Sequence, residues 1–233
     1  MSLRGCLFGA VNCLRQMNLK SFLRSTKVPG FLHHGLRCTL RFVRRFIDFE
    51  ICLVESSEAG ISVGTAPVGY EILRVTQDEF KAGRCDELLD KEHGWSFDRD
   101  DQCVAALYQE KIVAFTFQTS FPTVVREGLE FEFPGQFRYL YASFTASAHR
   151  GKKLAIACLA EGSQLTLHEF GNEVRRIWYV NVLNAASMAV GDSSGVELRV
   201  HGYIGYARIG ASYRCFASPG CRRLGIGFRA KPR

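Results

Sequence analysis

The sequence predicts an α/β protein in which one mixed sheet carries helices. Apolar segments with a period of two recur along the chain and are separated by turn residues, as expected of strands. Proline-free segments with apolar residues at helical spacing lie between these predicted strands. The chain has 233 residues, of which 47% are hydrophobic and 18 are phenylalanine, so it is long enough for one domain with a large core.

The predicted sheet begins with a strand over residues 70–75. Thr76 follows this strand, and its side chain can cap a helix together with Glu79, three residues further on. That helix is predicted to run to about Lys91. Two apolar runs separated by three polar residues then predict a hairpin over residues 103–119.

Residues 129–133 alternate strictly between apolar and acidic side chains. A strand has a period of two, so this alternation places Glu130 and Glu132 on one face and the phenylalanines on the other. We expect this short strand to lie beside the strand that begins at Tyr139. Paired carboxylates on one face suit general base catalysis, and they are also common on a solvated edge.

A strand, a basic turn and a helix follow one another between Tyr139 and Phe170. The strand is rich in Tyr, Phe and Thr, and the helix is free of proline. The turn between them carries Arg150, Lys152 and Lys153. The first N–H groups of a helix have no intrahelical partners, and the helix dipole favours an anion there. The segment suits a phosphate-binding turn, and equally a solvated turn between two core elements.

A second strand and a turn follow this helix. Residues 176–182 predict a strand, and Asn184 and Ser187 come directly after it. Asn184 also suits the N-cap of a further helix. Gly195-Val196 lies eleven residues after Asn184, and residues 197–216 then predict closing strands with bends at glycines.

Together, the strand, turn and helix of residues 139–170 and the strand and turn that follow them resemble the GNAT superfamily of acyl-CoA-dependent N-acyltransferases. The phosphate loop of that family is an Arg/Gln-x-x-Gly-x-Gly/Ala run, and a later Asn-x-x-Ser/Ala run is followed by Gly-Phe. The second run is matched by Asn184, Ser187 and Gly195-Val196. The resemblance covers roughly residues 70–216. The phosphate loop of the family corresponds in this chain to Arg150, Gly151, Lys152, Lys153, Leu154 and Ala155.

The resemblance implies a fold, an acyl donor and a reaction. The fold is a mixed, mostly antiparallel central sheet flanked by helices. The reaction is direct attack by a primary amine on acetyl-CoA or another acyl-CoA, with both substrates bound together and no metal. The pyrophosphate would lie on the loop of residues 150–155. The pantetheine arm would contact Asn184, Ser187 and the backbone of Thr145, Ala146 and Ser147.

Two positions depart from the family pattern. Lys153 replaces a usual glycine, which we expect the loop to tolerate because a residue at a helix N-terminus needs no positive φ. Many relatives protonate the thiolate with a tyrosine seven residues after the Asn, where this chain has Gly191. Ser187, Tyr179 or water would take that part, or the thiolate would leave unaided.

The general base is expected on the alternating strand. Members of the family often use a glutamate in this area, directly or through water, so Glu130 and Glu132 are the candidates. The acceptor amine carries no recognisable signature in the sequence.

Two other functions remain open. The first is an N-acyltransferase that takes long acyl chains from acyl carrier protein, since such carriers are acidic and both ends of this chain are basic. The second is a sensor that binds acyl-CoA without turnover, which the departures at Lys153 and Gly191 favour.

The net charge of +7 is concentrated at the two ends of the chain. Residues 1–50 carry +7 and residues 217–233 carry +5, so the segment between them carries −5. The first segment predicts two basic amphipathic helices, over residues 3–23 and 36–49, and a linker over residues 55–69 follows. Such helices bind membrane surfaces or acidic partners, or pack on their own domain, which we favour. No nucleic-acid-binding motif accompanies the charge.

We expect a helical basic extension with its linker (1–60), an acyltransferase domain (61–216) and a basic tail (217–233). The nine cysteines contain no Cys-x-x-Cys pair and no cluster with zinc spacing, so we expect reduced thiols. The sequence has neither the run of about 20 apolar residues that spans a membrane nor a recognisable signal peptide. We therefore expect a cytoplasmic protein, with basic ends that can meet a membrane surface.

Overall fold

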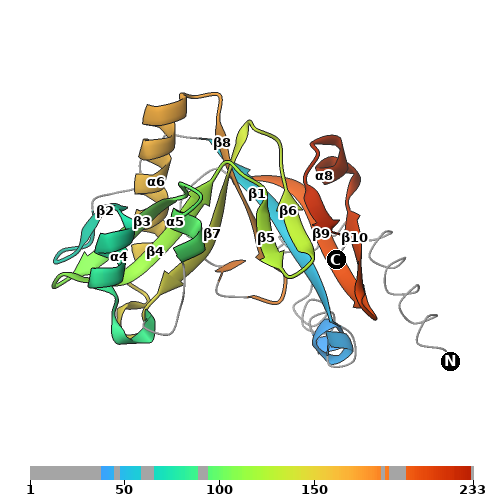
Figure 1. Cartoon of the computed structure of the whole chain (residues 1–233), viewed down its shortest axis with the longest axis horizontal. Helices are drawn as coiled ribbons and strands as arrows, with labels where there is room; N and C mark the ends of the chain where they lie inside the picture. Colours follow the sequence, from blue (N-terminus) through green and yellow to red (C-terminus); the bar gives the residue numbers. More distant parts are fainter. Residues whose placement is uncertain are drawn as a thin grey trace, which may run out of the picture.

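The computed structural model describes residues 38–44, 48–58, 66–88, 94–184, 187–188 and 198–231. They form an eight-stranded main sheet, a three-stranded small sheet and helices on both faces of the main sheet (Figure 1). The first expected amphipathic helix, the pair Gly195-Val196 and Gly191 lie outside the described residues. Of the second amphipathic helix, residues 38–44 are helical.

The main sheet is mixed and mostly antiparallel, as the sequence predicts. Among its described strands every neighbouring pair is antiparallel except β7 and β8, which are parallel. From one edge to the other the strands are β10 (Ser212–Ala217), β9 (Arg199–Ile209), β1 (Phe49–Ser57), β8 (Arg175–Asn181), β7 (Phe137–Thr145), β4 (Lys111–Thr119), β3 (Gln102–Tyr108) and β2 (Glu71–Val75).

Strand β1 is the main departure from the expected division of the chain. It pairs with β8 on one side and β9 on the other, so residues 49–57 belong to the sheet and not to an extension and linker. Cys52 and Val54 are fully buried, and Leu53 between them is 1% exposed. A strand buried on both faces shows a continuous apolar run instead of alternation, so periodicity does not reveal it. The boundary expected at residue 60 therefore cuts through the sheet domain.

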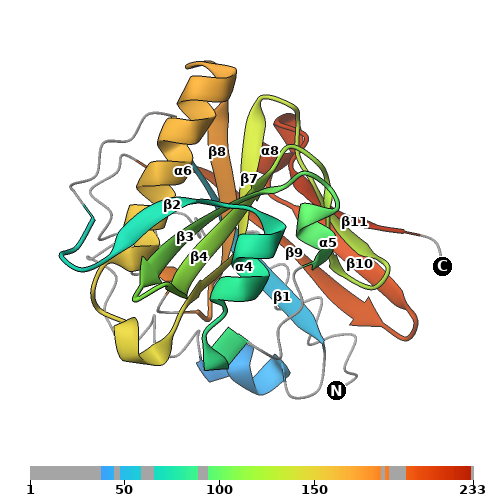
Figure 2. The ribbon, with the colours of Figure 1, turned by 60° about the vertical axis from the view of Figure 1, so that its left-hand side comes forward.

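Helices cover both faces of the main sheet (Figure 2). Helix α6 (Leu154–Phe170) lies on one face, where Leu154 packs against Val104 and Ala114. Helix α4 (Gln77–Gly83) and the short α5 (Gly94–Phe97) lie on the other face, where Phe80 and Phe97 pack with their ring centroids 5.5 Å apart.

Helix α4 begins as predicted and ends early. Thr76 Oγ1 accepts the N–H of Glu79 at 3.3 Å, and the Glu79 carboxylate accepts the N–H of Thr76 at 2.7 Å, which confirms the capping box. The helix ends at Gly83, because Arg84 forms a parallel bridge with Ile112. A Cβ at Gly83 would lie 3.1 Å from Ile112 Cγ1, so the glycine permits this close approach to the sheet. The chain then makes a short 3₁₀ turn, η1 (Asp86–Leu88).

The small sheet contains β11 (Gly227–Ala230), β6 (Leu129–Glu132) and β5 (Thr123–Arg126), in that order. β6 pairs with β11 and β5, so the expectation that it lies beside the Tyr139 strand is wrong. β11 and α8 (Pro219–Arg223) come from the segment expected to be a basic tail. That segment is therefore partly built into the fold.

The main hydrophobic core lies between the main sheet and the small sheet. Phe131 of β6 packs on Tyr139 of β7 and Tyr179 of β8, with ring centroids 4.6 and 5.0 Å apart. Burial of one large apolar side chain contributes about 1.5–3 kcal/mol to stability. These contacts fix the small sheet over the place where β7 and β8 meet.

The seven described cysteines form no disulfide bond with one another, and Cys6 and Cys13 lie outside the described residues. None of the described helices combines the length and the apolar character needed to cross a membrane.

Candidate functional site

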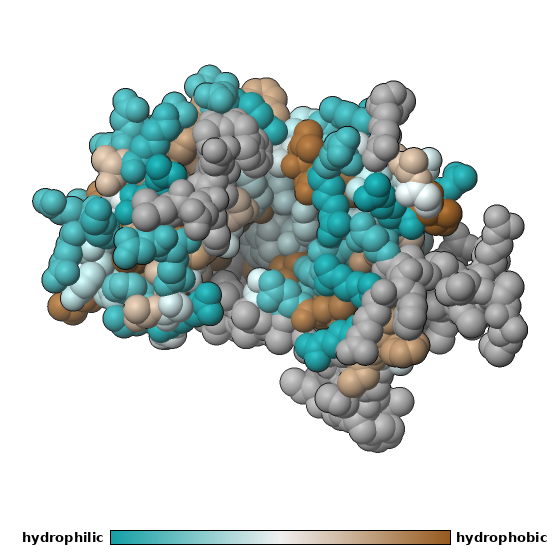
Figure 3. All heavy atoms as spheres, turned by 60° about the horizontal axis from the view of Figure 1, so that its bottom comes forward, coloured by the Kyte–Doolittle hydropathy of each residue, from teal (hydrophilic) through white to brown (hydrophobic). Residues whose placement is uncertain are grey.

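The parallel strands β7 and β8 separate along their length. They pair only where residues 137–139 meet residues 175–177. Beyond these pairs β7 continues to Thr145 and β8 to Asn181, and the two halves of the sheet diverge (Figure 1). Seen from the diverging ends, a hollow opens between the halves of the molecule (Figure 3). Among the described residues, β7 and β8 do not pair across this gap, so backbone groups that face it can pair with a bound molecule.

β7 contains a bulge beside the gap. Its register with β4 shifts between Phe115 and Phe117, so that Thr116 faces both Ala142 and Ser143. Ala142 has φ +51°, a left-handed conformation that costs about 1–2 kcal/mol for a residue other than glycine. Ala142 and Ser143 are both exposed. A bulge re-aims the backbone of its strand, here next to the open gap.

Beyond the bulge, the backbone of β7 alternates between β4 and the gap. The N–H of Ala146 donates to the Val113 carbonyl at 2.7 Å. Because strand backbone groups alternate in direction, the N–H and C=O of Thr145 point away from β4, toward the gap. The N–H and the hydroxyl of Ser147 donate to Glu87 at 3.0 and 2.6 Å. Of the three residues expected to contact the pantetheine arm through their backbone, Thr145 is thus the one whose backbone faces the gap.

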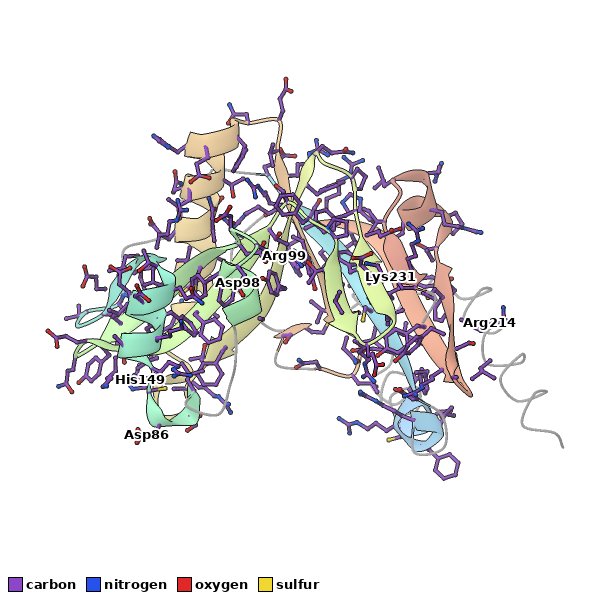
Figure 4. The ribbon with its side chains drawn as sticks, viewed as in Figure 1. Asp86, Asp98, Arg99, His149, Arg214 and Lys231 are labelled. Carbon is purple, nitrogen blue, oxygen red and sulfur yellow. The ribbon has the colours of Figure 1, made fainter. Side chains whose placement is uncertain are left out.

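The basic loop lies at the end of β7, where Figure 4 shows His149. Arg150 Nε donates to the Thr145 carbonyl at 3.3 Å. Gly151 has φ +77° and Lys153 has φ +61°. The expectation that Lys153 needs no positive φ is wrong, because this residue is the N-cap of α6 and is left-handed. Glycine adopts this conformation without strain, which accounts for the glycine in the family pattern.

Helix α6 begins without a side-chain cap. The side chain of its N-cap, Lys153, makes no capping hydrogen bond, and the N–H of Ala157 donates to the Lys153 carbonyl at 3.0 Å. The N–H groups of residues 154–156 therefore have no intrahelical partner, and the dipole of this 17-residue helix adds positive potential. Arg150 and Lys152 are exposed beside them. Backbone and charge together suit a phosphate.

The β8 margin of the gap ends in a capped turn. Asn184 Oδ1 accepts the N–H of Ser187 at 3.2 Å, which is the N-cap geometry that the sequence allows. Asn181 Oδ1 accepts the N–H of Leu183 at 2.8 Å. Asn184 is exposed and Ser187 is half-buried. The turn thus places Asn184 and Ser187 together at the end of β8.

Three tyrosines lie in a row on the core side of β7 and β8. Tyr139 stacks on Tyr141 and on Tyr179, with ring centroids 5.5 and 5.6 Å apart. Burial raises the pKa of all three hydroxyls above its ordinary value. Tyr179 therefore releases its proton less readily than a free tyrosine does, so it suits hydrogen bonding better than protonation of a thiolate.

The two glutamates of β6 face away from the gap. Phe131 between them points to Tyr139, so alternation directs Glu130 and Glu132 to the opposite face. There Glu130 pairs with Lys231 at 2.9 Å and Glu132 pairs with Arg229 at 2.8 Å. Figure 4 shows Lys231 over the small sheet, far from His149 at the end of β7. The structure does not bring these carboxylates together with the phosphate loop.

Glu50 of β1 is a carboxylate that the sequence-based account misses. Its oxygens accept hydrogen bonds from Asn181 Nδ2 at 2.6 Å and from the Tyr206 hydroxyl at 2.8 Å. Asn181 ends the part of β8 that diverges from β7, so Glu50 lies beside the β8 margin. Burial, and then the hydrogen bond to Glu50, raise the pKa of Tyr206, which therefore stays a donor. The one sequence signal for Glu50 is its place in the apolar run of β1.

Among the described residues, no three His, Cys, Asp or Glu side chains lie close enough together to hold a metal ion.

No protein-family model matches the sequence, and neither does any curated protein. Solved structures resemble the chain at low sequence identity. One is a Drosophila protein with 16% identity and a TM-score of 0.49, matched over 76% of this chain and 58% of its own. A putative acetyltransferase of the GNAT family from Novosphingobium aromaticivorans has 13% identity and a TM-score of 0.44, over 67% of this chain and 62% of its own.

A GCN5-related N-acetyltransferase from Kribbella flavida has 14% identity and a TM-score of 0.45, over 70% of this chain and 61% of its own. The chain thus spans about three fifths of the length of these structures. The superfamily named for two of them is the one that the sequence motifs resemble.

Proposed function

We propose that this protein is an N-acyltransferase that moves an acetyl or other acyl group from acyl-CoA to a primary amine. One juxtaposition carries the proposal. The gap that opens beyond Tyr139 and the uncapped, basic N-terminus of α6 both lie at the end of β7. An acyl-CoA has phosphates at one end and an extended arm with amide groups, so it needs both features side by side.

The acyl donor would bind along β7. Its phosphates would accept hydrogen bonds from the N–H groups of residues 154–156, with Arg150 adding charge. The pantetheine amides would pair with the gap-facing backbone of Thr145, as an added strand does. Asn184 and Ser187 would contact the arm from the β8 margin.

The reaction requires no covalent intermediate with the protein. The uncharged amine attacks the thioester carbonyl, the C–N bond forms, the C–S bond breaks, and the thiolate leaves. The nitrogen loses one proton and the thiolate gains one, so the step balances. Binding both substrates in one gap lowers the barrier through proximity. Backbone N–H groups at the bulge of Ala142 would stabilise the charge on the carbonyl oxygen.

Glu50 would accept the proton from the amine. Its carboxylate lies beside the β8 margin. One oxygen accepts a hydrogen bond from Asn181, and the other accepts one from Tyr206 and lies 3.9 Å from an Arg126 guanidinium nitrogen. Each oxygen can accept a further hydrogen bond. Glu130 and Glu132 are not proposed for this step because they point to the far face of the small sheet. The hydroxyl of Ser187 or water would protonate the thiolate.

A sensor that binds acyl-CoA without turnover is the second candidate. The strained Lys153 favours it, because its side chain stands where the family pattern places a bare glycine backbone. Release of free thiol from acetyl-CoA in the presence of primary amines separates the enzyme from the sensor, since the sensor releases none above the rate of hydrolysis.

Isothermal titration with CoA and acetyl-CoA tests the binding half of the proposal. The wild type is expected to bind both ligands with micromolar affinity. Arg150→Glu should weaken binding by about tenfold or more, because it reverses a charge at the phosphate loop. Arg222→Glu, a charge reversal at an exposed position of α8, is the matched control and should bind as the wild type does. If neither ligand binds the wild type, acyl-CoA is not the donor.

A further inference from the structure

A pocket of about 350 Å³ lies beside the phosphate loop and outside the gap. It is formed where the start of β2 meets the turn that joins β3 to β4. Its lining residues are Gly69, Tyr70, Glu71, Leu107, Gln109 and Glu110. The acyl transfer step proposed above makes no use of this pocket.

Tyr70 connects the pocket to the phosphate loop. Its hydroxyl accepts a hydrogen bond from Lys152 Nζ at 2.7 Å and lies 2.9 Å from His149 Nδ1. The Tyr108 ring packs against the rings of Tyr70 and His149, each with a centroid separation of 5.2 Å. We call Tyr70, Tyr108, His149 and Lys152 the aromatic–lysine cluster. Tyr70 holds the Lys152 ammonium at the edge of the pocket while Lys152 itself is exposed to a ligand.

The pocket and the cluster combine aromatic rings with a positive charge. Tyrosine rings stack on planar bases, and the lysine ammonium is a compact charge that binds phosphate. Glu71 and Glu110 line the pocket, and a carboxylate repels a phosphate and can accept hydrogen bonds from the amino group of a base. A ligand that places an aminopurine in the pocket and a phosphate on Lys152 would match both the aromatic rings with their neighbouring carboxylates and the positive charge.

We propose that this site binds the 3′-phosphoadenosine end of the acyl donor, with the base in the pocket and the 3′-phosphate on Lys152. The inference rests on the proposed function, because a pyrophosphate at the start of α6 brings the adenosine next to the loop that carries Lys152. It also selects the donor class. A carrier protein attaches its acyl group through phosphopantetheine, which has no adenosine to fill the pocket. The donor is therefore a CoA thioester.

Titration with CoA, 3′-dephospho-CoA and phosphopantetheine tests this inference on the full chain. The wild type is expected to bind CoA about tenfold or more tightly than 3′-dephospho-CoA, because only CoA carries the 3′-phosphate. In Lys152→Met the two affinities should become equal. Lys81→Met removes an exposed charge from α4, and this control should keep the wild-type difference.

A second variant tests the base. Tyr70→Leu should weaken CoA and 3′-dephospho-CoA alike and leave phosphopantetheine unchanged. Equal wild-type affinity for all three ligands would overturn the nucleotide site while keeping the acyl donor in the gap. A wild-type preference for CoA that survives in Lys152→Met would also overturn it. If the wild type binds none of the three, the proposed function fails, and this inference fails with it.

Discussion

Two residues of the basic loop between β7 and α6 have left-handed backbone conformations, Gly151 at φ +77° and Lys153 at φ +61°. Glycine adopts such a conformation at no steric cost, whereas a lysine there costs about 1–2 kcal/mol. Strain of this kind persists where the surrounding structure fixes the backbone, and it gathers at ligand-binding loops. The single position at which the chain departs from the glycine pattern of its loop is therefore a strained one.

Replacing the strained lysine should stabilise the protein. Lys153→Gly is expected to raise the free energy of unfolding by about 1 kcal/mol, because relief of the left-handed strain exceeds the added entropy of the unfolded chain. Gly151→Ala is the matched opposite. No atom lies within 4 Å of its added Cβ, so it should lower the free energy of unfolding by about 1 kcal/mol through backbone strain alone. Urea denaturation measures both, and a destabilised Lys153→Gly would refute the left-handed conformation of Lys153.

The role of Glu50 can be separated from that of the β6 glutamates. Glu50→Gln keeps the side-chain shape and removes the base, so acyl transfer to a responsive amine should fall by roughly 100-fold or more. Glu130→Gln removes a carboxylate that faces away from the gap and should leave the rate within about twofold. Thiol release gives the rates, and titration with CoA checks that acyl-donor binding persists in both variants. Equal rates for Glu50→Gln and the wild type would exclude Glu50 as the base.

At the scale of elements, β1 determines where the domain begins. It lies between β8 and β9, and Ile51, Cys52, Leu53 and Val54 are each at most 5% exposed. A chain that starts at residue 61 leaves both neighbouring strands with an unpaired edge and loses these apolar contacts. Such edges favour aggregation.

Two truncated chains test this assignment. A chain of residues 38–233 should unfold cooperatively, because it contains every described strand, whereas one of residues 61–233 should be insoluble or lack a cooperative transition. Thermal unfolding followed by circular dichroism distinguishes them. A cooperative transition in the 61–233 chain would show that β1 is dispensable.

The elements that the sequence predicts are those specified locally. The hairpin of β3 and β4, the capping box of α4 and the whole of α6 depend on neighbouring residues, and the structure contains all three. The sequence does not predict β1 and β11, because each of them pairs with strands far away in the sequence. The sequence does not predict where α4 ends for a similar reason, because the helix ends where Arg84 forms a bridge with the distant Ile112.

The candidate site divides in the same way. The basic loop of residues 150–155 and the Asn184 turn are each one continuous segment of sequence, and they lie at the ends of β7 and β8. The sequence correctly predicts that Glu130 and Glu132 lie on one face of their strand. Which neighbours that face meets depends on the pairing of β6 with β11 and β5, which the local sequence does not specify. Glu50 gains its position only from the insertion of β1 beside β8.

At the scale of the whole molecule, the two halves of the sheet meet at β7 and β8. These strands pair at one end, the closed end, and separate toward the other, the open end. Buried Arg176 of β8 helps to hold the closed end: it donates to the carbonyl of Leu159 in α6, and to Ser57 Oγ of β1 at 3.4 Å. Arg176 is 1% exposed, and burial lowers the pKa of this guanidinium. The small sheet covers the same end through Phe131. In the part of the chain that the structure describes, the open end lies along the diverging parts of β7 and β8.

The central claim is that the acyl donor lies in this gap with its phosphates on α6, and hydrogen–deuterium exchange of the full chain with and without CoA tests it most directly. Bound CoA should slow exchange at the amides of residues 143 and 145, on the gap side of β7, and of residues 154–156, which would donate to it, and leave residues 227–230 of β11 unchanged. Protection that misses residues 143 and 145 and the start of α6, or no protection at saturating CoA, would contradict the assignment of this site.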